Sequence, residues 1–275
     1  MRGLPNLDNI DLDWAAPGVL LATIDRPRSA NTVSAQVSRD LLALADLCAT
    51  DTTVRAVVIT GSGDRFFCAG ADLRDPEFGP GWIQLARRAY DAFADLAVPT
   101  IAAVNGLALG GGTELTLTCD VRFADPSAQF GLPEVKIGSL PGAGGMTRLQ
   151  SLIGPAAARH LVFTGRQISA DRALELGLVD HLSQSGNSVA EAVDYAREIA
   201  QYAGYALRAA KTSFANALGT PTAAALTTEY HLFDTMATPE QMALEQQRAA
   251  DRDPVYARIF QSQAPSAESS TTTKV

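Results

Sequence analysis

Two glutamates and the glycines around them are the residues of this chain whose types and spacing could do chemistry. Glu114 directly follows the run Gly110–Thr113, and Glu134 lies twenty residues later, after a proline. Two carboxyl groups in one site can hold different protonation states and act as a general acid and a general base. Each glutamate also has a structural explanation. Glu114 would complement the dipole of a helix that starts there, and Glu134 would be a solvated loop acid.

The glycines at Gly110–Gly112 could stabilise a negative charge. Consecutive glycines at a turn from strand to helix let backbone N–H groups approach a ligand, and the helix N-terminus adds partial positive charge. Leu115 stands where a dinucleotide-binding loop has its third glycine, so the loop suits a developing oxyanion better than a pyrophosphate. A further cluster, Pro141–Gly145, follows Glu134 and would bring two carboxyls near this anion site. The alternative is that the glycines only let a strand and a helix pack closely.

Other reactive side chains have no matching partners in the sequence. The histidines lie far apart without metal-ligand or triad spacing, and the cysteines show no CxxC pair, so we expect no metal site, no Ser-His-Asp triad and no disulfide framework. These residues are His160, His181, His231, Cys48, Cys68 and Cys119. Sparse cysteines are typical of a reducing compartment. The N-terminus has no secretory signal region, and no apolar run reaches the roughly 20 residues of a membrane span. Together with the cysteines, these features predict a cytoplasmic protein that does not enter a membrane.

The elements that must position these residues alternate between strand and helix. Ser34 caps a first predicted helix, and a second is predicted over Trp82–Leu96. From about Ser188 the sequence becomes Ala-rich and helical. The pattern predicts an α/β chain with a helical C-terminal subdomain. Runs rich in Val, Ile and Thr predict strands at 19–24, 54–60, 100–104 and 121–124, and the helical region is broken at Gly204, Gly219–Pro221 and Pro239.

The charge balance limits the partners. The 275 residues include 22 basic and 30 acidic side chains, a net charge of −8, and 47% are hydrophobic. Such a chain folds around a core and lacks the broad cationic surface of a nucleic-acid or anionic-membrane binder. All but three of the basic residues are arginines, the side chain best suited to paired phosphate contacts. Arg26 and Arg28 flank a proline in one loop, where they are either solvated charges or phosphate ligands.

Taken together, several ordered motifs resemble the enoyl-CoA hydratase/isomerase (crotonase) family. The resemblance covers about Val19 to Asn216 and its motifs are long and correctly spaced. They are Phe67–Leu73, Ile101–Leu115, Cys119–Asp120, Phe130–Val135, Leu140–Gly145, Leu161–Ala170 and Gly177–Asp180.

The resemblance implies a fold and an assembly. The fold would be a crotonase-like spiral of ββα repeats with a helical C-terminal trimerisation region, assembled as a homotrimer or a homohexamer. The spiral core would span 1–200 and the trimerisation helices 201–262. The lack of apolar periodicity in the last residues predicts a disordered tail over 263–275.

The resemblance also implies a ligand and the residues that meet it. The substrate would be an acyl-CoA thioester, with no metal or redox cofactor beyond the coenzyme A of the substrate itself. The family's oxyanion-hole N–H donors map onto Ala71 and Gly111. Contacts to the substrate and its coenzyme A map onto Arg26, Arg28, Ala30, Ala69, Asp72, Leu73, Arg74 and Gly142.

The reaction follows from the glutamate pair, because hydratases of this family carry both acids at the positions that match Glu114 and Glu134. We expect an enoyl-CoA hydratase that converts a trans-2-enoyl-CoA to a 3-hydroxyacyl-CoA, as in fatty acid β-oxidation. Glu114 would be the base toward water and Glu134 the acid toward Cα. A Δ3,Δ2-enoyl-CoA isomerase or another crotonase-fold acyl-CoA enzyme would need only one acid. A non-catalytic coenzyme A-binding scaffold or an RNA-binding relative is a further alternative, and the acidic net charge disfavours RNA.

The chain departs from the family pattern at three places. Thr113 stands where many hydratases have Cys or Ala, Met146–Thr147 replaces a common Thr-Gln, and Glu240–Phe260 lacks the usual charged motif. The shape of the acyl pocket, set by the variable helix over Pro76–Ala92 and by the C-terminal region, is therefore left open.

Overall fold

The computed structural model describes residues 3–261. The chain divides into two compact units, one ending at Lys211 and the other beginning at Thr212. The tail expected over 263–275 lies outside the described residues.

The first unit is built on a six-stranded sheet with the order β1-β2-β3-β5-β7-β10. β1 pairs antiparallel with β2, and the remaining neighbours are parallel. The interior strands are buried on both faces, which explains their continuous runs of Val, Ile and Ala. The strands are β1 Ile10–Ala16, β2 Val19–Ile24, β3 Ala56–Gly61, β5 Thr100–Val104, β7 Val121–Ala124 and β10 His181–Leu182.

A second sheet of four short strands has the order β4-β6-β8-β9. β4, β6 and β8 run parallel, and β9 pairs antiparallel with β8. Three times the chain makes a strand in the first sheet, a short strand in the second and then a helix. This repetition confirms the ββα repeats that the resemblance implied. The short strands are β4 Phe66–Cys68, β6 Leu107–Leu109, β8 Gln129–Gly131 and β9 Gln167–Ser169.

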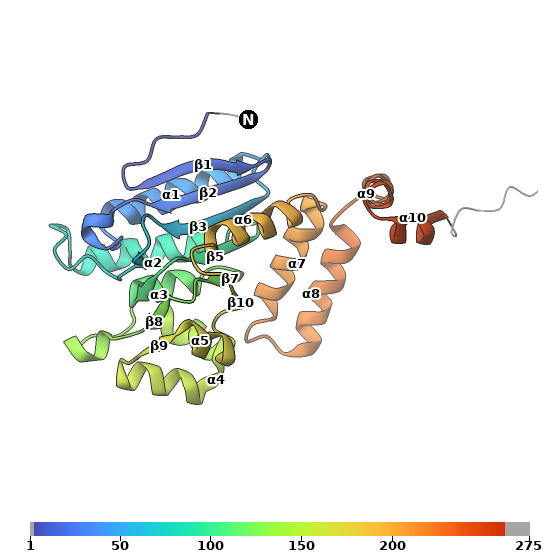
Figure 1. Ribbon diagram of the computed structural model, residues 1–275. Helices are drawn as coiled ribbons and strands as arrows, with labels where there is room; N and C mark the ends of the chain where they lie inside the picture. Colours follow the sequence, from blue (N-terminus) through green and yellow to red (C-terminus); the bar gives the residue numbers. More distant parts are fainter. Residues whose placement is uncertain (1–2, 262–275) are drawn as a thin grey trace, which may run out of the picture. The chain divides into compact units, whose positions relative to one another are not determined.

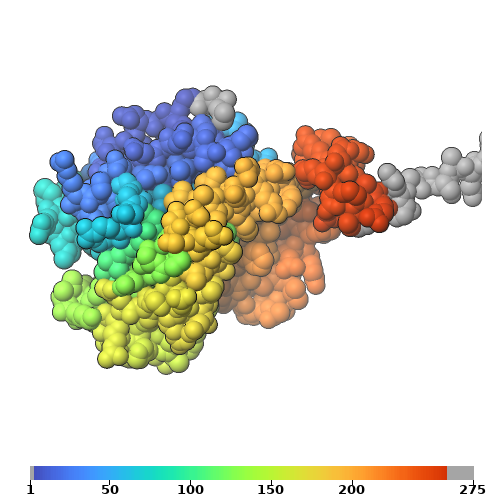
Figure 2. Space-filling model, viewed as in Figure 1, coloured from blue at the N-terminus to red at the C-terminus, as the bar shows by residue number. Residues whose placement is uncertain are grey.

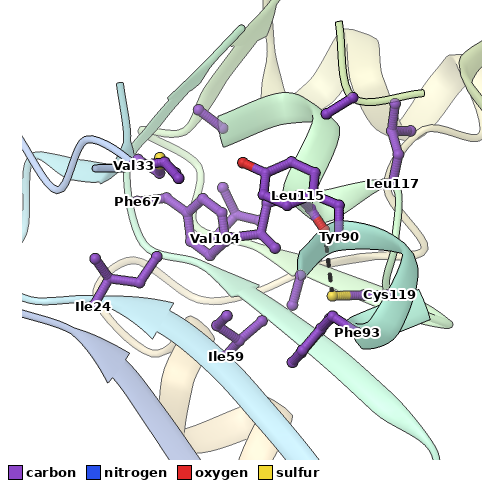
Figure 3. Close-up of a cluster of buried hydrophobic side chains, with 14 of the residues drawn as sticks. Ile24, Val33, Ile59, Phe67, Tyr90, Phe93, Val104, Leu115, Leu117 and Cys119 are labelled. Atoms are coloured by element: carbon purple, nitrogen blue, oxygen red, sulfur yellow. Dashed lines mark hydrogen bonds between the residues drawn. The ribbon is translucent and has the colours of Figure 1, made fainter. Parts of the chain in front are cut away.

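Helices cover both faces of the first sheet. Ile24, Ile59 and Val104 of the sheet pack against Tyr90 and Phe93 of α2 in the main core (Figure 3). On the opposite face, α6 packs on β3, β5 and β7, and the layers can be followed in Figure 1. The helical elements of this unit are α1 Ala35–Thr50, α2 Pro80–Ala94, α3 Gly111–Thr116, α4 Gly145–Thr164, α5 Ala170–Leu176 and α6 Ser188–Ile199, with 3₁₀ turns η1 Pro27–Ser29 and η2 Glu134–Ile137.

The C-terminal region is helical, as expected. α7 Gly204–Ala217 crosses the boundary between the units, and α8 Thr222–Thr235, α9 Pro239–Arg252 and α10 Pro254–Gln261 follow. The predicted breaks coincide with the start of α7, the α7–α8 turn and the start of α9. Within these fully described segments, α8 and α9 contain no buried residue, and large apolar side chains are exposed at Phe214, Leu218, Tyr230, Phe233 and Leu244. Over residues 3–261, no helix combines the length and the apolar character needed to cross a membrane.

The structure differs from the sequence prediction at the strands that carry the loops. β4 and β6 lie inside segments interpreted as glycine loops, because strands of three residues show too little periodicity to be recognised. β1 was not predicted either, although Ile10, Leu12 and Trp14 alternate with acidic residues in the manner of a half-buried strand. α2 begins at Pro80 rather than near Trp82, a difference typical of helix ends.

A substitution at Gly112 tests how closely the second sheet and α3 pack. A Cβ at this position would overlap the carbonyl oxygen of Cys68 and lie 3.0 Å from the Cys68 Cβ. We expect Gly112→Ala to lower the free energy of unfolding by about 1–3 kcal/mol, because neither atom can move without shifting a strand. Urea denaturation measures the change. Gly81→Ala in α2 is the matched control, since nothing lies within 4 Å of its added Cβ. A Gly112→Ala protein as stable as the control would contradict this packing.

Candidate active site

Two backbone N–H groups converge between the loops that follow β4 and β6. The ideal Cβ position on Gly111 lies 3.5 Å from the Ala71 nitrogen, and that on Gly70 lies 3.5 Å from the Gly111 nitrogen. Neither the Ala71 nor the Gly111 N–H donates a hydrogen bond to any residue of the described chain. One donor lies in the loop after β4 and the other at the start of α3, and two adjacent unused donors of this kind can stabilise an oxyanion.

Positive backbone angles shape these loops. Gly70 has φ +101° and Gly110 has φ +51°, a region that other residues adopt only with strain. The Gly70 loop is tied to the chain at Val33, whose N–H donates to Gly70 O and whose carbonyl accepts from Asp72 N. The Ala71 and Gly111 N–H groups are therefore presented by turns that the surrounding backbone holds in place.

Thr113 ties the second sheet to α3. Its buried hydroxyl lies 2.7 Å from Ala108 O and accepts from the Gly131 N–H at 3.2 Å. Thr113, which departs from the family pattern, thus links β6 and β8. Glu114 follows β6 in the chain, and Glu134 follows β8.

Glu114 lies in the first turn of α3, and it is only 4% exposed. Its Oε1 accepts hydrogen bonds from Ala143 N at 2.7 Å and from Gly145 N at 2.9 Å. Burial raises the pKa of Glu114, while these two N–H groups and the charges of Arg148 and Arg87 act to lower it. The Pro141–Gly145 cluster, expected near the anion site, therefore supplies hydrogen-bond donors to the carboxyl itself.

Glu134 opens η2, the turn that follows β8. Its Oε2 is buried and has no hydrogen-bond partner among the described residues. A Cβ on Gly110 would lie 2.9 Å from Glu134 Oε1, so the carboxyl rests against the oxyanion loop. Burial, and to a lesser extent the charge of Glu114, raise the pKa of Glu134 to about 7. A carboxyl with this pKa can give and take a proton near neutral pH.

The chain after Glu134 lies at the surface. Ile137 and Leu140 are exposed, and their stretch projects as the lime-green segment in Figures 1 and 2. The glutamate thus lies at the inner end of an exposed segment. A cleft of about 460 Å³ borders the 141–145 loop. It is lined by Arg87, Asp91, Pro141–Gly144 and Met146–Arg148.

The comparisons with known proteins identify the family of the chain. A model of the enoyl-CoA hydratase/isomerase family matches residues 15–256, most of the chain. The chain belongs to this family. Among its relatives, the short-chain-enoyl-CoA hydratase of Clostridium acetobutylicum is 35% identical over 74% of this chain and 80% of its own. The 2,3-dehydroadipyl-CoA hydratase of Escherichia coli is 38% identical over 81% of this chain and 88% of its own.

Solved structures of the family confirm the fold. The enoyl-CoA hydratase of Bacillus anthracis superposes with a TM-score of 0.84 at 35% identity, covering 89% of this chain and 96% of that one. The predicted crotonase fold, α/β with a helical C-terminal region, is therefore confirmed.

Most of the residues expected to meet coenzyme A, all but Gly142, come together in this family member. The Ala69 N–H donates to Ala30 O at 3.1 Å, so the η1 loop and the 69–74 segment are neighbours. Arg26 is held inside this pair of loops by an ion pair with Asp72 at 2.8 Å. Arg26 and Asp72, both predicted to contact coenzyme A, are thus paired with each other. The members that face solvent are Arg28, Leu73 and Arg74, whereas Gly142 lies apart, against Ile83 of α2.

Sequence reasoning missed Tyr90 of α2. Its hydroxyl donates to Gly111 O at 2.7 Å, on the residue whose N–H faces the oxyanion site. Burial, then the charges of Cys68, Glu114 and Glu134, raise the pKa of Tyr90 well above its usual value, so the hydroxyl stays a donor. The apolar spacing of α2 marks position 90 as buried, but nothing in the sequence indicates which carbonyl the hydroxyl meets.

The other reactive side chains play no part in this site. Burial raises the pKa of the Cys68 thiol to about 12, which fits the expected packing role. His181 pairs with Glu191 at 3.3 Å, beside a separate cleft between β7 and α6. Within residues 3–261, no group of His, Cys, Asp and Glu could hold a metal ion.

The raised pKa of Glu134 predicts a pH-dependent stability. A carboxyl whose folded pKa lies near 7 binds more protons when folded than when unfolded, so it costs stability as the pH rises from about 4.5 through 7. We expect Glu134→Gln to be more stable than the parent at pH 8 and equally stable at pH 4. Urea denaturation at both pH values measures this. The exposed Glu229→Gln serves as the control, and equal gains at pH 4 and pH 8 would contradict the shift.

Proposed function

We propose that this protein hydrates trans-2-enoyl-CoA thioesters to 3-hydroxyacyl-CoA. One observation carries the proposal: a buried and a half-buried carboxyl in unlike surroundings lie beside a pair of unused N–H donors. Glu114 accepts two hydrogen bonds, whereas Glu134 has a buried oxygen without a partner among the described residues. The hydratases among its relatives support the same reaction class.

The oxyanion site would activate the substrate. The thioester carbonyl oxygen would accept hydrogen bonds from Ala71 N and Gly111 N. This polarisation makes Cβ electrophilic, and the two donors stabilise the enolate-like charge that develops as water adds. Loss of one such donor typically costs on the order of 10²- to 10³-fold in rate.

The glutamates would divide the proton transfers. Glu114, favoured as the anion by its two N–H partners, would take a proton from the water whose oxygen bonds to Cβ. Glu134, with a pKa near 7, would be protonated in part of the population and give its proton to Cα. The proton on Glu114 then returns to Glu134 through solvent, so the enzyme is regenerated and the net reaction is addition of one water. No group beyond the substrate's own coenzyme A is required in this scheme.

The assembly and location belong to the same proposal. We infer a homotrimer or homohexamer in which the C-terminal helices contact a neighbour, because large apolar side chains such as Phe214 and Phe233 are exposed in the single chain. The coenzyme A would lie along the η1 loop, with Arg28 and Arg74 as the exposed cations. We place the enzyme in the cytoplasm because its sparse, unpaired cysteines fit a reducing compartment.

Enoyl-CoA turnover tests the function. With crotonyl-CoA and longer trans-2-enoyl-CoAs, the parent protein should remove the enoyl absorbance, and Glu134→Gln should lower kcat by about 10²- to 10⁴-fold because a general acid is lost. The exposed Glu175→Gln should retain full activity. Failure of the parent on every chain length, or an unimpaired Glu134→Gln, would contradict a hydratase.

A second substrate separates hydration from isomerisation. A Δ3,Δ2-enoyl-CoA isomerase shuttles one proton, so Glu114→Ala would keep most of its activity on a 3-enoyl-CoA. A hydratase instead needs Glu114 for water, and we expect Glu114→Ala to lose about 10²-fold or more in kcat on crotonyl-CoA.

A further inference from the structure

One peptide group joins a guanidinium of α2 to the Glu114 carboxyl. Arg87 Nε donates to Gly142 O at 2.6 Å. The N–H of the same peptide belongs to Ala143 and donates to Glu114 Oε1 at 2.7 Å. The cation therefore lies at the carbonyl end of the unit whose other end binds the carboxyl.

The next peptide is held from α4. Arg148 Nη1 donates to Ala143 O at 2.8 Å, and its Nη2 pairs with Asp91 at 2.8 Å. Asp91 lies one helical turn after Arg87 in α2, so two helices hold the loop from the side opposite Glu114. A loop with glycine at 142, 144 and 145 has little conformational preference of its own. Arg87 and Arg148 bind two of its carbonyls, while its Ala143 and Gly145 N–H groups donate to Glu114.

Arg87 differs from Arg148 and from its neighbour Arg88. Arg148 is paired with Asp91, whereas Arg87 is exposed and forms no ion pair with any described residue. Both charges favour the Glu114 carboxylate, Arg148 more strongly than Arg87. Arg88 lies next to it in α2 and makes no hydrogen bond or ion pair within the described chain. The contact with Gly142 O is thus a specific property of position 87.

We propose that Arg87 is a positioning residue for Glu114, acting through the Gly142–Ala143 peptide. This inference rests on the proposed role of Glu114 as the base toward water. A cation on the carbonyl polarises the peptide and strengthens its N–H as a donor to the carboxylate. The orientation of Glu114 and its ionised form are both stabilised by this contact.

The charges around Glu114 determine whether removal of Arg87 raises or lowers the pKa of this carboxyl. Arg87 and the neutral Tyr90 face it from α2, Arg148 from α4, and Glu134 from η2. The arginines favour the carboxylate and Glu134 opposes it. Removing Arg87 therefore raises the pKa of Glu114 and shifts the acidic limb of the pH–rate profile to higher pH.

The pH dependence of kcat/KM tests the inference. With crotonyl-CoA, Arg87→Leu should lower kcat about tenfold with little change in KM, and should move the acidic limb upward in pH. Arg87→Lys, which keeps the charge and one donor, should recover part of both effects, and Arg88→Leu should match the parent. An acidic limb unmoved in Arg87→Leu, or an effect confined to KM, would overturn the proposal.

A titration independent of turnover separates this inference from the proposed function. Carboxyl ¹³C NMR of glutamate-labelled protein reports the Glu114 midpoint, with the signal assigned by its loss in Glu114→Gln. Arg87→Leu should raise that midpoint, and Arg87→Gln, which keeps a donor without the charge, gives the same test if the leucine variant does not fold. A raised midpoint in a protein that hydrates no enoyl-CoA would refute the function and leave the contact standing. An unchanged midpoint would refute the inference.

Discussion

Close contact between two stretches of backbone is the constraint on which the rest of this structure depends. The loop after β4 and the start of α3 approach until the Ala71 and Gly111 nitrogens are neighbours, and only glycine fits at 70 and 112, where a Cβ would meet Leu109 O or Cys68 O. Backbone donors held in this way need no reorganisation when charge develops on a ligand. Tyr90 adds to the constraint from α2 by binding the carbonyl of Gly111.

The unlike surroundings of the two glutamates follow from the same packing. The approach of α3, η2 and the 141–145 loop buries Glu114 and half-buries Glu134, and burial raises both pKa values. The loop offers N–H groups to one carboxyl only. Glu114 accepts two hydrogen bonds from it, and Glu134 is left with a buried oxygen that has no partner within residues 3–261. One arrangement of backbone therefore leaves two adjacent N–H donors unused by the described residues, gives one carboxyl two hydrogen bonds, and raises the pKa of the other carboxyl to about 7.

Strong local signals in the sequence predicted their elements correctly. Ser34 caps α1 by accepting from Val37 N, β2 begins and ends at Val19 and Ile24 as expected, and α6 starts at Ser188. β4, β6 and β8 were not predicted, because a strand of three residues is stabilised by its partners in the sheet and leaves almost no pattern of its own. The sequence left Arg26 as a solvated charge or a phosphate ligand, and only the tertiary structure shows its ion pair with Asp72.

By itself, the sequence determined the family, the α/β class and the identity of the residues that converge, because these follow from motifs and spacing along one chain. Only the tertiary structure decided which groups from distant parts of the chain contact one another. It placed Tyr90 on Gly111, linked Arg87 to Glu114 through a single peptide, and left one oxygen of Glu134 buried without a described partner. Hydrogen bonds and desolvation depend on distances of a few ångströms between residues far apart in the sequence, and no local pattern records those distances.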